Sequence, residues 1–100
     1  MRRGTTPTHT FQIPVDASLL EEVKITYAQN GKEVLSKYKE DCKLNGTTVE
    51  VTLTQEETLK FSGSKPCQIQ VRVLTTGGQA CASKIMEEKV LPLLDGEVLK

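Results

Sequence analysis

The sequence predicts an all-β fold, an antiparallel β-sandwich of about seven strands with one short helical turn at residues 54–59. One observation is that apolar and polar residues alternate along several segments, which is the period-two pattern of half-buried strands. A second is that Asn30-Gly31, Asn45-Gly46 and Gly77-Gly78 separate these segments. Because such pairs accept the positive φ angles of a tight type I′ turn, we expect three hairpins.

The strands follow from this alternation. The clearest is CQIQVRVL, in which Cys67, Ile69, Val71 and Val73 share one face and polar residues share the other. Before it, Pro14 interrupts the pattern, and Asp16 or Ser18 can cap a short helical turn. We expect strands at Thr8–Ile13, Glu21–Gln29, Lys32–Lys39, Asp41–Leu44, Thr47–Leu53, Pro66–Thr75 and Gln79–Val90.

The segment LTQEETLKF, residues 53–61, breaks the alternation. Thr54 and Glu57 have the spacing of a capping box, in which each side chain satisfies a free backbone N–H at the start of a helical turn. We expect this turn to cross the end of the sandwich between two strands and to hold Leu59 and Phe61 inward. The alternative is an exposed binding helix, but one turn is unstable without packing.

A strand, a helical turn across the end, a second strand and a final hairpin follow one another in the same order in immunoglobulin-like domains. The chain lacks the buried Trp and the spaced Cys pair of antibody domains. The term immunoglobulin-like therefore describes an expected topology only.

Composition limits the partners that we expect. The 100 residues suit a single domain over residues 1–100, with an N-terminal arm (1–7) and a C-terminal tail (91–100). Thirteen basic and thirteen acidic residues cancel, so no long-range field attracts nucleic acid, and no apolar run approaches the roughly 20 residues that span a membrane. No apolar segment follows MRR as in a secretory signal, so we expect a soluble protein made and kept inside a cell.

Few residues suggest chemistry, and we expect no catalytic residue, cofactor or metal. Cys42, Cys67 and Cys81 form no CxxC pair, which favours reduced thiols, although a Cys67–Cys81 bridge across adjacent strands is the alternative. His9 and a cysteine could form a catalytic pair. Its place near the terminus instead favours a solvated or edge-strand histidine.

The two ends are the candidate contact sites for protein partners. The arm is polar and broken by a proline, and its candidate contacts are Arg3, Thr5, Thr6 and Pro7. The tail is apolar, and its candidate contacts are Leu93, Leu94, Val98 and Leu99. Such a tail can fold back over the core, fray, or dock on another subunit by strand addition or by filling a groove.

Four segments carry a resemblance: RGTTPT (3–8), LTQEET (53–58), IQVR (69–72) and DGEV (95–98). Over essentially its whole length the chain resembles a family of small proteins encoded in prophages of Gram-positive bacteria. More distantly it is similar to the amino-terminal β-sandwich of phage baseplate upper proteins, an attachment module that continues there into a receptor-binding part. The resemblance implies a virion or tail-associated protein that is made in the bacterial host cytoplasm.

The function expected from these observations is non-enzymatic assembly of a phage tail or baseplate. The partners would be further copies of the chain, other tail proteins, or both, bound through edge strands and terminal arms. The alternative is a carbohydrate- or host-surface-binding module, for which Tyr27 and Tyr38 are the available aromatic platforms. A small regulatory or inhibitory prophage protein is a third class, supported by no particular residue.

Overall fold

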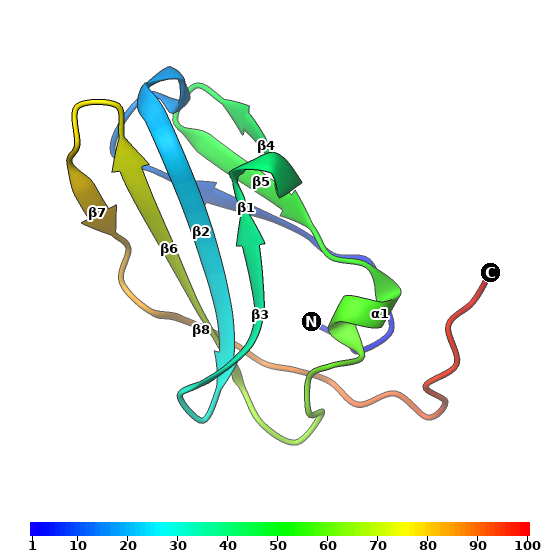
Figure 1. Cartoon of the computed structure of the whole chain (residues 1–100). Helices are drawn as coiled ribbons and strands as arrows, with labels where there is room; N and C mark the ends of the chain where they lie inside the picture. The colour runs from blue at the N-terminus through cyan, green and yellow to red at the C-terminus, as the bar shows by residue number, and fades with distance from the viewer.

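A computed structural model describes residues 1–100 as two antiparallel sheets that face each other in a β-sandwich (Figure 1). The three-stranded sheet has the order β1-β5-β4, and the five-stranded sheet has the order β3-β2-β6-β7, with β8 also paired to β6. The expected all-β sandwich is confirmed. The strands are β1 (Thr8–Gln12), β2 (Leu20–Gln29), β3 (Lys32–Tyr38), β4 (Cys42–Asn45), β5 (Thr48–Thr52), β6 (Cys67–Thr75), β7 (Ala80–Ala82) and β8 (Met86–Glu88).

The strand order is immunoglobulin-like. In the variable-type domain one sheet carries strands A, B, E and D, and the other carries G, F, C and C′. Here β1, β5 and β4 take the places of B, E and D, while β3, β2, β6 and β7–β8 take those of C′, C, F and G. No strand pairs with the other edge of β1, where strand A would lie.

The core lies between the sheets and contains 17 buried apolar residues. The alternation on β6 is confirmed, because Cys67, Ile69, Val71 and Val73 are at most 6% exposed. Tyr27 and Phe61 are among the largest fully buried side chains, and their rings meet edge to face with centroids 6.0 Å apart. Such an arrangement suits the ring quadrupoles.

The three hairpins are confirmed, but their turns differ. Asn30 (φ 54°) and Gly31 (φ 74°) both have the positive φ of a type I′ turn between β2 and β3. At the other two hairpins only Gly46 (φ 59°) and Gly78 (φ 86°) are positive, so the type I′ prediction is wrong there. Each of those loops is built around a single left-handed glycine.

The last expected strand, Gln79–Val90, is broken into β7 and β8. At the break, the Ser83 hydroxyl accepts a hydrogen bond from the Val71 N–H (3.0 Å) and donates one to the Lys84 carbonyl (2.8 Å). A side chain thus replaces a backbone partner in the ladder. The other strand bounds agree with the structure within one residue at either end.

Short helical turns join the strands. Asp16 caps a 3-10 turn at Ala17–Leu19, as expected, and a second 3-10 turn at Lys39–Asp41 was not expected. The turn α1 (Gln55–Thr58) has the predicted capping box, with Thr54 Oγ1 accepting from Glu57 N at 3.2 Å and Glu57 Oε1 accepting from Thr54 N at 2.8 Å. It carries the chain from β5 to β6 in the other sheet, and Phe61 is buried while Leu59 is only half-buried. None of the helices is long and apolar enough to cross a bilayer.

All three cysteines are free, which excludes the alternative Cys67–Cys81 bridge in this fold. Cys67 lies opposite Glu88 on β8, whereas Cys81 lies opposite Val73, six residues further along β6. Six residues of strand span about 20 Å. A disulfide tolerates only about 7 Å between Cα atoms.

Candidate functional site

The N-terminal arm lies beside the start of the C-terminal tail. Leu91 N donates to the Met1 carbonyl at 2.8 Å, and Arg3 N donates to the Leu91 carbonyl at 3.1 Å. These bonds form an isolated parallel bridge between Arg2 and Leu91, and Arg2 Nη1 adds a bond to the Pro92 carbonyl at 2.8 Å. The two segments that sequence analysis selected separately are therefore neighbours in space.

The turn α1 supports both segments. On the arm, Arg3 Nη2 donates to the Leu59 carbonyl at 2.9 Å, and Thr58 Oγ1 donates to the Thr5 carbonyl at 2.9 Å. On the tail, Gln55 Nε2 donates to the Leu99 carbonyl at 3.0 Å, and Leu99 N donates to Gln55 Oε1 at 2.8 Å. This reciprocal amide pair is the contact that holds the end of the tail.

Arm, tail and α1 enclose a hollow of about 570 Å³, which we name the arm–tail surface. Leu94 is fully exposed beside it, and Leu99 is 76% exposed. At Gly4, a Cβ atom would lie 2.5 Å from Leu93 Cδ2 of the tail, and the φ of +74° is a conformation that favours glycine. The arm–tail surface is lined by Arg2, Gly4, Gln55, Pro92, Leu93, Leu94, Asp95, Glu97 and Leu99.

The eight predicted contact residues divide into two groups. Arg3, Pro7, Leu93 and Val98 are half-buried against their own chain, and Thr5, Thr6, Leu94 and Leu99 are exposed. Of the residues that line the arm–tail surface, sequence reasoning missed Arg2, Gly4, Gln55, Pro92, Asp95 and Glu97. The sequence did give a signal that Gln55 lies near the arm, because the expected turn α1 crosses the end of the sandwich at which the arm begins. Nothing in the sequence indicated that Gln55 pairs with Leu99.

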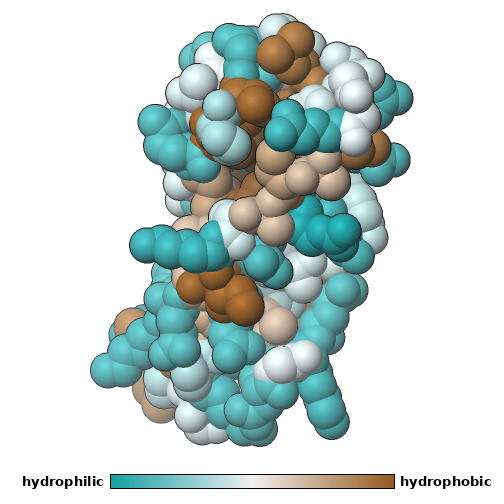
Figure 2. Space-filling model, turned by 90° about the vertical axis from the view of Figure 1, so that its left-hand side faces the viewer, coloured by the Kyte–Doolittle hydropathy of each residue, from teal (hydrophilic) through white to brown (hydrophobic).

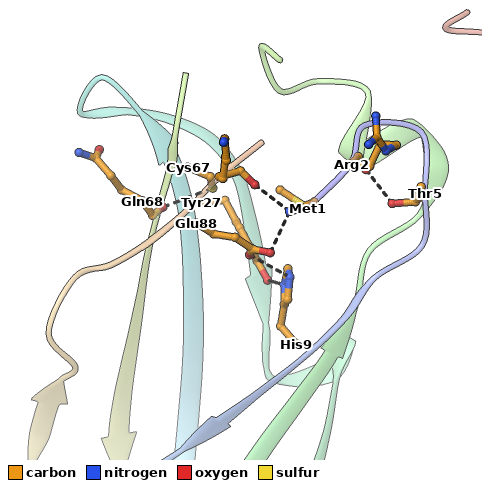
Figure 3. Close-up of polar contacts among 9 residues, drawn as sticks. Met1, Arg2, Thr5, His9, Tyr27, Cys67, Gln68 and Glu88 are labelled. Carbon is orange, nitrogen blue, oxygen red and sulfur yellow. Dashed lines mark hydrogen bonds and ion pairs between the residues drawn. The ribbon is translucent and has the colours of Figure 1, made fainter. Parts of the chain in front are cut away.

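A polar cluster fixes the arm to β8 (Figure 3). The Met1 ammonium lies 3.1 Å from Glu88 Oε1 and donates to the Lys89 carbonyl at 2.7 Å. On β1, in the other sheet, His9 Nδ1 lies 2.7 Å from the Tyr27 hydroxyl, and Nε2 lies 3.3 Å from Glu88 Oε2 without hydrogen-bond geometry. Glu88 thus faces two nitrogen groups from the N-terminal part of the chain.

Burial in this cluster favours the neutral forms of His9 and Tyr27. Burial lowers the pKa of His9, and the Met1 ammonium acts in the same direction, while Glu88 partly opposes it. Burial, with smaller effects of nearby acidic groups, raises the pKa of Tyr27 well above its ordinary value, so its hydroxyl remains able to donate to His9 Nδ1. Because the side chain of His9 is only 14% exposed, the expectation of a solvated ring is wrong. Its place on an edge strand is confirmed.

Cys42 and Cys67 are not activated as nucleophiles. Burial raises the pKa of Cys67 to about 11 and that of Cys42 to about 11. His9 faces Tyr27 and Glu88, so the cysteine pair considered from the sequence does not form here. No three His, Cys, Asp or Glu side chains gather as metal ligands would.

The two tyrosines considered as sugar platforms differ. Tyr27 is fully buried and cannot stack on a ligand. Tyr38 is 45% exposed, lines a second hollow of about 550 Å³, and has Lys24 Nζ 5.9 Å from its ring centroid. Only Tyr38 remains available as a platform.

Comparisons with known proteins give one structural match. No family model matches the chain, and no curated protein matches it. The V domain of amphioxus IgVJ-C2 matches with 14% identity over 93% of this chain and 97% of that chain, at a TM-score of 0.39. The immunoglobulin-like strand order rests on the strand pairing alone.

Proposed function

We propose that the chain is a non-enzymatic structural or assembly protein of a phage, a tail or baseplate component that binds other proteins through its edge strands and terminal segments. Its partners are other tail proteins, further copies of the chain, or both. The observation that carries this proposal is the arm–tail surface, where the fully exposed Leu94 and the largely exposed Leu99 border a hollow. Exposed apolar side chains grouped in this way are typical of interaction sites.

The low number of contacts on the tail supports the same proposal. Beyond Pro92, the reciprocal pair between Gln55 and Leu99 is the hydrogen bonding that joins the tail to the rest of the chain. Segments with few buried contacts open at low free energy and are the ones that bind partners. The tail can therefore rearrange without disturbing the sandwich.

The proposal is tested in purified phage particles from an induced lysogen that encodes the chain. We expect quantitative mass spectrometry to find the chain at a fixed copy number per particle. Its absence from particles that contain the other tail proteins would contradict the proposal.

A matched pair of variants ties the result to the arm–tail surface. Replacing Leu94 and Leu99 by serine should lower the copy number at least about tenfold, because apolar area is lost from the contact. The control is Leu19→Ser, which alters a leucine that is 49% exposed elsewhere. Equal incorporation of both variants would mean that this surface is not the contact.

The carbohydrate-binding alternative has one supporting observation. Tyr38 lines its hollow together with Glu21, Glu22, Arg72 and Glu40, and an aromatic ring beside charged groups is a common sugar site. Glycan binding by the purified chain that is lost in Tyr38→Ala and kept in Tyr38→Trp would favour this function over assembly.

A further inference from the structure

One edge of β1 has no partner strand. Leu53 N donates to the Pro7 carbonyl at 3.0 Å, and Ile13 N donates to the Thr47 carbonyl at 2.9 Å, which shows that the odd positions bond to β5. In an antiparallel ladder the alternate residues direct their N–H and C=O groups the other way. The backbone groups of Thr8, Thr10 and Gln12 therefore face away from β5, along an edge that pairs with no strand.

An apolar hollow lies at the C-terminal end of β1. The hollow has a volume of about 240 Å³ and lies between the end of β1 and strand β7, with Ile13, Val71, Val73 and Cys81 among its walls. Figure 2 views the molecule from the side on which β7 is the outermost strand in Figure 1, and hydrophobic atoms reach the surface there between hydrophilic ones. We name the unpaired edge of β1 together with this hollow the β1 slot.

The tail contains a segment that fits this slot. Over Leu94–Val98, apolar Leu94, Gly96 and Val98 alternate with acidic Asp95 and Glu97, which is the pattern of a half-buried strand. The segment has five residues, the same length as β1. In this structure it is not a strand, because Asp95 Oδ1 accepts a hydrogen bond from Glu97 N at 2.9 Å and bends the chain.

We propose that the β1 slot receives the Leu94–Val98 segment of a second copy of this chain, which adds to β1 as a strand. The inference deepens the proposed assembly function and rests on it, since it names the contact that would join neighbouring copies. Backbone bonds to Thr8, Thr10 and Gln12 give the register, and Leu94, at the end of the segment beside Gln12, fills the hollow. Slot and tail are different surfaces, so the contact is heterologous and joins copies into a ring or a filament.

Charge supports this occupant. Asp95 and Glu97 form no ion pair within the chain, and neither does Lys84. Lys84 directly follows Ser83, a wall residue of the slot. An acidic tail segment therefore meets an unpaired basic residue at the rim.

The position of the tail favours a second copy over the same chain. The tail is anchored at Leu91 by Met1 and Arg3, and its last residues pair with Gln55. In Figure 1 it leaves the sandwich past α1, on the side opposite to β7. A tail from a neighbouring copy reaches the slot without reversing this path.

The test uses the full-length chain and its native thiol at Cys81. A tagged donor carries Leu94→Cys together with Cys81→Ser, and the acceptor is the unmodified chain. Under mild oxidation we expect a disulfide between donor and acceptor, seen as a covalent heterodimer. An acceptor with Cys81→Ser should reduce this product at least about tenfold, because the contact places Leu94 against Cys81. Equal heterodimer yield with both acceptors would overturn the inference, as would a disulfide formed only within one chain that carries both Leu94→Cys and native Cys81.

Variants of the slot separate strand addition from other contacts. Thr10→Pro removes an outward N–H that the folded monomer does not use, so sedimentation velocity should show weaker self-association than for Thr10→Val, which keeps the N–H. Should Thr10→Pro fail to fold, Ala82→Glu and Ala82→Lys serve instead, with association weakened at least about tenfold by Glu relative to Lys. Equal association within both pairs, or a concentration-independent monomer, would overturn the inference. If the chain is present in particles but these experiments fail, the assembly function stands and only the slot contact is refuted. If the chain self-associates through the slot but is absent from particles, only the phage role is refuted.

Discussion

His9 makes the stability of the protein depend on pH. Burial lowers its pKa in the folded state, whereas the unfolded chain keeps a value of about 6.5. The unfolded state therefore binds a proton that the folded state does not, and the contribution to stability is complete above about pH 6.5 and is lost as the pH falls through the folded-state pKa. We expect the free energy of unfolding in urea to decrease between pH 7.5 and pH 5.

A His9→Gln variant should lose this part of the pH dependence. The groups that face the ring are Tyr27, Glu88 and the Met1 ammonium, and only the last two carry charge. Measurements above pH 5 keep ordinary carboxylates, with pKa values near 4, outside the titration. A pH profile as steep in His9→Gln as in the unmodified chain would show that another group is responsible.

At the scale of single elements, α1 illustrates a local prediction that succeeds. Its capping box was visible in the sequence because Thr54 and Glu57 interact over three residues. A second role of Glu57 could not be seen in the sequence. Its carboxylate forms an ion pair with Lys37 of β3, a residue that is distant along the chain. Burial tends to raise the pKa of Glu57, but the hydrogen bonds from Lys37 and Thr54 outweigh it and lower that pKa.

Removal of the cap should weaken both the turn and the tail that rests on it. Thr54→Ala is expected to lower the free energy of unfolding by about 1 kcal/mol, because the Glu57 N–H loses the acceptor that caps the turn. It should also speed amide exchange at Leu99, whose N–H is held by Gln55 at the start of α1. Thr54→Ser keeps the hydroxyl and is the control; loss of stability in that variant would point to packing of the threonine methyl instead.

Strand bounds and arm contacts show why other elements were harder to predict. The break between β7 and β8 depends on Ser83 bonding to Val71, a partner twelve residues away, and serine has no special signature in a strand. The arm and the tail lie side by side because of a backbone bridge between Arg2 and Leu91. The alternation of apolar and polar residues and the turn residues indicate short-range structure, whereas these contacts join distant parts of the chain.

At the scale of the whole molecule, alternation predicted both sheets because each strand must bury one face. It also identified the buried side of β6, although it could not say which strand would be left unpaired. That depends on the arm, which turns away to meet the tail at Leu91 instead of running back along β1. The unpaired edge is thus a consequence of long-range packing that a single sequence does not encode in its periodicity.

The shared core predicts one cooperative unfolding transition. Val23 of β2 and Val49 of β5 belong to different sheets, yet both are at most 2% exposed and lie in the same hydrophobic cluster. Val23→Ala and Val49→Ala should each lower the free energy of unfolding by roughly 1.5–3 kcal/mol with an unchanged denaturant slope, because each leaves a cavity in that cluster. Circular dichroism and the near-ultraviolet signal of the tyrosines should then give coincident urea transitions for both variants. Two separate transitions, with only one shifted by each variant, would mean that the sheets unfold independently and that the sandwich is not held by a single core.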